Sequence, residues 1–207
     1  MEKRTYIFLI IILLILISFQ YDNTMVREIS KLRNNFLDSF FAGLTFISSE
    51  IIIFFFLTSL FLWSEKKREW ILPLWFTLFV SAVISFILKY LIQRPRPFQI
   101  GLISIMKVLE KANFSTWNFS FPSFQTMFVF SAIPILSKEF PRLKKFWIIL
   151  SVLVGFSRVY FGLHFLSDVI VGGVIGYFIG VWVIDLEKEN RFGRYWWKKV
   201  FGKKEKI

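Results

Sequence analysis

Six long apolar segments constrain the fold of this chain more than any other feature of its sequence. A transmembrane helix needs about 20 apolar residues, and inside a bilayer only helices or closed barrels satisfy the backbone polar groups. Several of these segments are shorter, so we expect each to extend into its flanking residues. The sequence therefore predicts an all-α, polytopic membrane protein with six transmembrane helices, at about Tyr6–Phe19, Phe40–Trp63, Trp70–Leu88, Phe124–Leu136, Phe146–Tyr160 and Leu166–Ile184.

Composition and charge exclude several other classes of protein. The chain has no cysteine and one histidine, which argues against a disulfide framework and a transition-metal site. Its net charge of +12 could suggest nucleic acid, but the basic residues form short clusters between apolar segments, as membrane insertion requires. We therefore expect no nucleic-acid partner. With no linker-like stretch, residues 1–207 are predicted to form one domain, whose oligomeric state the sequence does not indicate.

The placement of the basic clusters predicts the orientation of the chain in the cell membrane. Six crossings put both termini on one side, and the positive-inside rule makes that side the cytoplasm. The first segment is expected to stay as an uncleaved anchor, because Phe19, Gln20 and Tyr21 follow it where a signal peptide would have small residues. The loops after the third and fifth segments then face outward. The expected cytoplasmic clusters are Lys3–Arg4, Lys66–Arg68, Lys138 with Arg142, Lys144 and Lys145, and the tail from Lys188.

Three cations lie at the ends of apolar segments on this outer side. Lys89, Arg96 and Arg158 would be costly there without an anion, and the arginine fork suits phosphate oxygens. The fourth segment begins at Pro122 and Ser123, and a helix N-terminus with a hydroxyl is a further anion site. These residues predict a phosphate-binding site, with Arg94 in at most a supporting role.

The only histidine of the chain, His164, precedes Asp168 by four residues in the same outer region. If the last helix begins there, both side chains share a face, and the carboxylate can fix the imidazole tautomer and raise its nucleophilicity. The alternative is a structural histidine hydrogen-bonded to a loop carbonyl group. Three cations at the same membrane face favour the reactive interpretation.

These segments resemble the signature of the type-2 phosphatidic acid phosphatase (PAP2) family. That signature reads Lys-x6-Arg-Pro, then Pro-Ser-Gly-His, then Ser-Arg-x5-His-x3-Asp; the first part is complete from Lys89 to Pro97, and the third from Ser157 to Asp168. The six-helix layout is also similar to that family. The resemblance implies that His164 forms a phosphohistidine, oriented by Asp168, without a metal or other cofactor. It also implies that the phosphate is held by Lys89, Arg96, Ser123, the Phe124 backbone and Arg158.

The second part of the signature departs from the family, because Phe124 replaces the glycine and Gln125 replaces the histidine. In the family that histidine protonates the leaving oxygen, which glutamine is unable to do. General acid catalysis is typically worth about 10²- to 10⁴-fold in rate.

A lipid monophosphate expels an alkoxide, with a conjugate-acid pKa of about 16, whereas a diphosphate expels a phosphate monoester with a second pKa of about 6. Gln125 therefore favours a diphosphate, such as a polyprenyl diphosphate in the outer leaflet. Glu110 is a weak alternative acid.

Other functions stay open from the sequence. A catalytically impaired protein that binds phosphorylated lipid headgroups would need only the cations, and a lipid phosphotransferase would share the first half-reaction. A transporter is disfavoured because the charges gather at one face, with Asp38 and Glu50 expected to pair with loop cations.

Three further stretches have the periodicity or composition of interfacial helices. They are Met25–Phe36, Gly101–Asn113, and the basic aromatic cytoplasmic tail at 190–207, for which a solvated tail is equally compatible.

Overall fold

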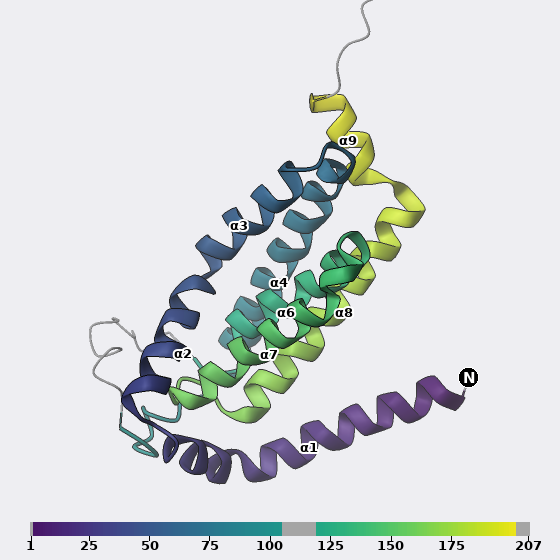
Figure 1. Cartoon of the computed structure of the whole chain (residues 1–207). Helices are drawn as coiled ribbons and strands as arrows, with labels where there is room; N and C mark the ends of the chain where they lie inside the picture. Colours follow the sequence, from purple (N-terminus) through teal and green to yellow (C-terminus); the bar gives the residue numbers. More distant parts are fainter. Residues whose placement is uncertain (1, 105–118, 202–207) are drawn as a thin grey trace, which may run out of the picture.

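The computed structural model describes residues 2–104 and 119–201, and all the regular structure in these ranges is helical (Figure 1). The predicted all-α class is therefore confirmed. Two short 3₁₀ helices, η1 (Glu65–Trp70) and η2 (Pro141–Leu143), join longer elements. The α-helices are α1 (Glu2–Ser30), α2 (Asn35–Ile47), α3 (Glu50–Leu62), α4 (Ile71–Ile92), α6 (Phe124–Glu139), α7 (Lys144–Tyr160), α8 (Leu166–Asn190) and α9 (Phe192–Phe201).

Helix α6 is the centre of the bundle and packs against α8, α7 and α4. Its contact with α8 is close because α8 presents glycines to it. A Cβ atom at Gly176 would lie 2.2 Å from the Met127 carbonyl oxygen, and one at Gly172 would lie 2.8 Å from that of Ser123. Small residues at such an interface let two backbones approach. This packing brings the N-terminus of α6 beside the start of α8.

Judged by the length and apolar composition of the helices, fewer of them could cross a membrane than the six that the sequence predicts. Among the described residues, three helices are long and apolar enough to cross a bilayer, or four if the bent α2–α3 pair counts as one. The other two predicted segments form α6 and α7, with 16 and 17 residues. Much of the apolar character of α6 serves the protein core, because most of its side chains are buried. Multi-pass membrane character is supported, whereas the count of six stays a prediction.

The predicted continuous helix at Phe40–Trp63 is wrong in one respect, because it breaks into α2 and α3, which are bent by 62°. The break falls at Ser48 and Ser49. The Ser48 carbonyl oxygen accepts a hydrogen bond from the side chain of Gln125. A side chain from α6 thus forms a hydrogen bond with a backbone carbonyl group at the break. The composition of the Phe40–Trp63 segment does not indicate this contact.

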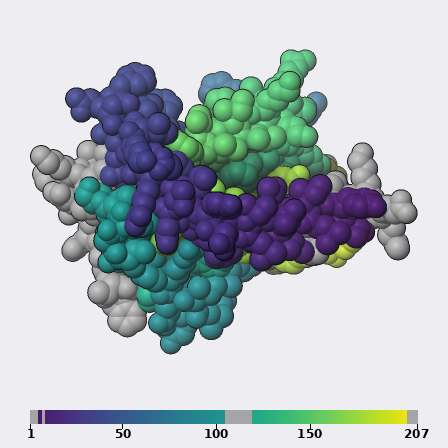
Figure 2. All heavy atoms as spheres, turned by 90° about the horizontal axis from the view of Figure 1, so that it is seen from below, coloured from purple at the N-terminus to yellow at the C-terminus, as the bar shows by residue number. Residues whose placement is uncertain are grey.

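Helix α1 crosses one end of the molecule, where Figure 2 shows it as a purple ridge. It continues to Ser30, so the first half of the predicted interfacial stretch at Met25–Phe36 is the last part of α1. Many apolar side chains of its first two thirds are exposed. Its C-terminal part reaches the bundle, where Val26 is fully buried. Helix α1 is therefore anchored at the end where α8 begins (Figure 1).

The first part of the predicted tail is a helix that docks on the bundle. The Gly193 backbone N–H donates a 2.7 Å hydrogen bond to the buried Glu187 carboxylate, and Arg194 pairs with Glu69 through two bonds of 2.6 Å. Trp196 and Phe201 of α9 are exposed. Residues 202–207 lie outside the described part of the chain, as do Glu110 and most of the predicted interfacial helix at Gly101–Asn113.

Candidate active site

The predicted site residues meet at the end of the bundle where α4 and α7 finish and α6 and α8 begin. Lys89 is in the last turn of α4, Arg96 in the following loop, and Arg158 in the last turn of α7. Ser123 is the N-cap of α6, and its backbone N–H donates a 3.0 Å hydrogen bond to the Asp168 carbonyl oxygen in the first turn of α8. The fold thus gathers the three sequence segments that were predicted to carry the chemistry.

His164 is held in one tautomer by a backbone group. Its Nδ1 lies 2.7 Å from the carbonyl oxygen of Ser120. Because a carbonyl oxygen only accepts hydrogen bonds, we assign the ring proton to Nδ1. The lone pair is then on Nε2, which lies 3.4 Å from Nη1 of Arg96. The imidazole therefore directs its lone-pair nitrogen at the Arg96 guanidinium, from which it accepts a long hydrogen bond.

The surroundings also keep this imidazole neutral. Burial lowers the pKa of His164 well below its ordinary value of 6.5, since only 5% of the residue is exposed. The neighbouring charges of Arg96, Lys89 and Arg158 lower this pKa further, in that order. At neutral pH the ring is therefore unprotonated at Nε2, which is the form that can attack phosphorus.

The three cations have backbone or side-chain partners in the site. Lys89 Nζ donates a 2.5 Å hydrogen bond to the Phe119 carbonyl oxygen, and Arg96 Nη1 donates one of 2.9 Å to that of Leu163. Burial lowers the pKa of Arg96 to about 10, which leaves its guanidinium charged at neutral pH. Backbone carbonyl groups satisfy N–H donors without neutralising their charge, so Arg96 retains a strong attraction for an anion.

Asp168 is next to His164 but is bonded to other groups. Its Oδ2 lies 3.7 Å from the imidazole Nδ1, which is within ion-pair range and too long for a hydrogen bond. The same oxygen accepts a 2.8 Å bond from the Phe165 N–H, and Oδ1 accepts one of 2.7 Å from Arg94. The role of Asp168 in orienting His164 stays a prediction, and Ser120 is the direct partner in this structure.

Gln125 links two parts of the site. Its Nε2 donates hydrogen bonds to the Ser48 carbonyl oxygen, at 2.5 Å, and to the Ser48 hydroxyl, at 2.7 Å. Its Oε1 accepts a 2.5 Å bond from Arg158, whose other terminal nitrogen donates to the Thr45 hydroxyl. At the position where the PAP2 signature has an acid, this chain therefore has an amide that ties Arg158 to the α2–α3 break.

The N-terminus of α6 forms another side of the site. Phe124 is its first residue, and the first N–H groups of any helix have no intrahelical acceptor. The Ser123 side chain accepts no hydrogen bond from a backbone N–H of this helix; its hydroxyl lies 2.8 Å from that of Thr126 in the first turn. The predicted contribution of Ser123 and the Phe124 backbone to phosphate binding is compatible with this placement and stays a prediction.

Sequence reasoning missed two polar partners of the site, Ser120 and Asp22. Ser120 lies between the first two signature segments, and nothing in its spacing marked it. Asp22 lies on α1, next to the apolar run, with 4% of its side chain exposed. A carboxylate so close to a predicted span could have been noted, because such residues are rarely without a partner.

Fold and site together define a membrane protein with a basic site around a single buried histidine. The sequence model of the PAP2 superfamily matches residues 70–192, which include every signature position. The chain belongs to the PAP2 superfamily, as its motifs predict.

Proteins of known name are similar over much of the chain. The undecaprenyl-diphosphatase of Sulfolobus acidocaldarius is 29% identical over 133 residues, which are 63% of this chain and 61% of that protein. The match thus spans less than two thirds of that relative. A crystal structure of a transmembrane PAP2-type phosphatidylglycerolphosphate phosphatase from Bacillus subtilis has a TM-score of 0.69 and 24% identity, covering 93% of this chain and all of the other. The crystal structure of Aquifex aeolicus LpxE has a TM-score of 0.65 and 26% identity, and the match covers 79% of this chain and 94% of the other. These relatives support the predicted phosphoric-ester hydrolase.

Proposed function

We propose that this protein is a lipid phosphatase that removes the terminal phosphate from a lipid diphosphate through a phosphohistidine. His164 Nε2 attacks the terminal phosphorus, a P–N bond forms, and the P–O bond to the lipid monophosphate breaks. Water then attacks the phosphohistidine and releases inorganic phosphate. The observation that carries this proposal is the buried His164, whose Nδ1 lies 2.7 Å from the Ser120 carbonyl oxygen and whose Nε2 lies 3.4 Å from Nη1 of Arg96.

The preference for a diphosphate rests on Gln125. Both ends of its amide are bonded within the protein, to Ser48 and to Arg158. An amide has no proton to deliver at neutral pH, so the leaving group has to depart as an anion. A phosphate monoester does so readily and an alkoxide does not. The name of the Sulfolobus acidocaldarius relative, an undecaprenyl-diphosphatase, supports the same class of substrate.

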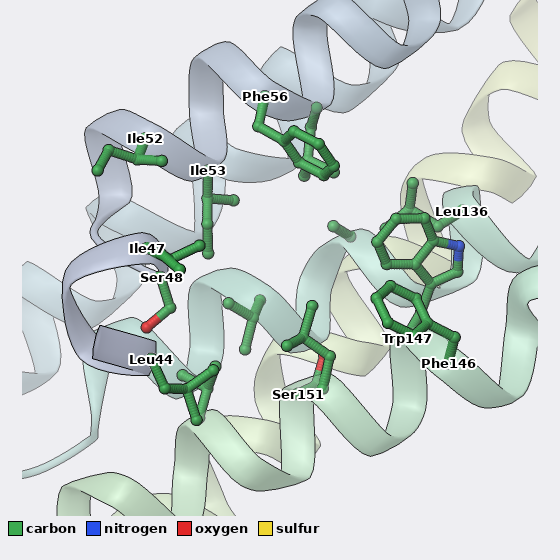
Figure 3. Close-up of a pocket in the computed structure, with 15 residues that line it drawn as sticks. Leu44, Ile47, Ser48, Ile52, Ile53, Phe56, Leu136, Phe146, Trp147 and Ser151 are labelled. Atoms are coloured by element: carbon green, nitrogen blue, oxygen red, sulfur yellow. The ribbon is translucent and has the colours of Figure 1, made fainter. Parts of the chain in front are cut away.

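An apolar cavity beside the site supports a substrate with a hydrocarbon chain. The cavity has a volume of about 280 Å³ and is lined by α2 and α3 on one side and α6 and α7 on the other. Figure 3 shows these side chains facing one another across it, from Ser48 at one end to Trp147 at the other. Ser48 is also the partner of Gln125. The cavity therefore begins at Ser48, which is two hydrogen bonds away from Arg158.

A comparison of two lipids tests the proposed leaving group. Phosphate release from a polyprenyl diphosphate is expected to exceed release from phosphatidic acid by about 10²- to 10⁴-fold in kcat/KM, which is the usual contribution of a general acid. Both are measured with purified protein in the same detergent. Equal rates would show that another group delivers the proton and would overturn our interpretation of Gln125. Label transferred from the diphosphate to a second lipid or sugar, instead of to water, would identify a phosphotransferase.

We further propose six crossings, made by α1, the α2–α3 pair, α4, α6, α7 and α8, with the site facing the outside of the cell membrane. The basic clusters and the pairing of each predicted segment with one helix or helix pair support this topology.

Because the chain has no cysteine, single cysteines can report its topology without background labelling. In sealed, right-side-out vesicles, a membrane-impermeant maleimide is expected to label Lys31→Cys, and to label Glu65→Cys only after permeabilisation. Both positions are exposed. The reverse pattern would place the site on the cytoplasmic face.

A further inference from the structure

A buried carboxylate on α1 is joined to the candidate active site by three hydrogen bonds. Asp22 accepts bonds from the Ser167 backbone N–H at 2.9 Å, the Ser167 hydroxyl at 2.5 Å, and Arg94 Nη2 at 2.7 Å. Arg94 uses its other terminal nitrogen to bond Asp168 at 2.7 Å. One guanidinium thus lies between two buried carboxylates, one from α1 and one from the PAP2 signature.

These bonds act on the part of the chain that carries His164. Ser167 is the second residue of α8, so Asp22 accepts one of the N–H groups that a helix leaves unpaired at its start. Asp168, the third residue, accepts the N–H of the N-cap Phe165. The guanidinium of Arg94 also stacks on the Phe165 ring, 3.9 Å from its centre. The turn that follows His164 is therefore held from α1 as well as from within α8.

The same arrangement sets the position of the Asp168 carboxylate relative to the imidazole of His164. Arg94 divides its bonds among Asp22, Asp168 and the Ser167 hydroxyl, while Asp168 keeps one oxygen 3.7 Å from Nδ1 of His164. Without the Asp22 charge, Arg94 would pair with Asp168 alone and would be free to rotate toward it. Both the position of the carboxylate and its field at the imidazole would change.

We propose that Asp22 is a positioning residue for the phosphatase reaction, acting through Arg94 and Ser167 on Asp168 and His164. It touches neither the phosphate site nor the imidazole. It also lies on α1, outside the matched range 70–192. The first helix would then supply part of the catalytic geometry in addition to crossing the membrane. The kinetic part of this inference rests on the proposed function.

The test compares Asp22→Asn, Arg94→Gln and the double variant. We expect Asp22→Asn to lower kcat by about 10- to 100-fold, as small displacements of catalytic groups do, with KM changed less than about threefold. Because Asp22 and Arg94 act on the same turn, the loss of kcat in the double variant should be smaller than the product of the two single losses, since neighbouring effects are not additive. Asp38→Asn is the matched control. This substitution removes a carboxylate on the neighbouring helix α2 that accepts a 2.5 Å hydrogen bond from the Tyr160 hydroxyl. It should leave kcat unchanged.

A second readout does not depend on turnover. With a purification tag that lacks histidine, ¹⁵N-histidine labelling gives one imidazole, because the chain has a single histidine. Asp22→Asn is expected to shift its ring nitrogens and to speed exchange of the Nδ1 proton with water, whereas Asp38→Asn should not. If the wild type hydrolyses no lipid, the proposed function fails and this measurement still decides the positioning role. If Asp22→Asn lowers only the Tm and leaves kcat and the imidazole signals unchanged, Asp22 only stabilises the packing of α1 and the positioning role is wrong.

Discussion

Replacing His164 by alanine is expected to lower kcat for a lipid diphosphate by roughly 10⁴-fold or more, the usual scale for removal of a catalytic nucleophile. The chain has no second histidine to take over. The structure orients this one with Nδ1 bonded to the Ser120 carbonyl and Nε2 directed at Arg96. Phosphate release by purified protein measures the loss.

A matched variant separates chemistry from folding. His164→Asn keeps an N–H donor that can reach the Ser120 carbonyl oxygen, so its Tm should stay closer to that of the wild type while its activity is lost. In rapid-quench experiments with labelled diphosphate, the wild type should carry acid-labile phosphate on position 164, which is the only histidine available. Binding of the lipid with neither turnover nor labelling would instead support a headgroup-binding protein.

Replacing Arg96 by alanine is expected to lower kcat/KM by about 10²- to 10³-fold, as loss of one preorganised electrostatic contact in an active site typically does. Arg96 is buried, bonds the Leu163 carbonyl and lies 3.4 Å from Nε2 of His164. Its removal takes away a proposed phosphate ligand and the charge nearest the imidazole. Arg96→Lys should recover only part of the loss, because lysine keeps the charge without the planar fork.

The same variant has a pH signature with a definite sign. Arg96 is the charge that most lowers the pKa of His164, after burial. In Arg96→Ala that pKa should therefore rise toward 6.5, and the neutral, reactive imidazole should be lost at a higher pH than in the wild type. The single ¹⁵N-labelled histidine reports this titration directly, and the acid limb of kcat/KM should move in the same direction. An unchanged titration would show that Arg96 does not act on the imidazole.

The sequence predicts well those features that depend on local spacing or on the average polarity of a segment. Apolar segments mark the helices because burial in lipid or in the core requires them, whatever their neighbours are. The spacing of His164 and Asp168 predicts their proximity because a helix begins between them. The cations at segment ends are predicted to gather at one end of the bundle, because a membrane confines such charges to its faces.

The partners of the site residues depend instead on how the helices pack. Ser120 lies 44 positions from His164, and Asp22 lies 72 positions from Arg94. No periodicity connects such residues. The sequence marks Gln125 only as a missing acid, whereas the fold places it between Arg158 and Ser48, at the α2–α3 break.

The close contact of α6 and α8 explains why these partners meet. Gly172 and Gly176 allow the two backbones to approach until the Ser123 N–H bonds the Asp168 carbonyl oxygen. The ends of four helices and the C-terminal part of α1 then converge at one depth. Sequence patterns record which side chains avoid water, whereas hydrogen-bond partners require the crossing positions of the helices, and those arise only when the bundle is assembled.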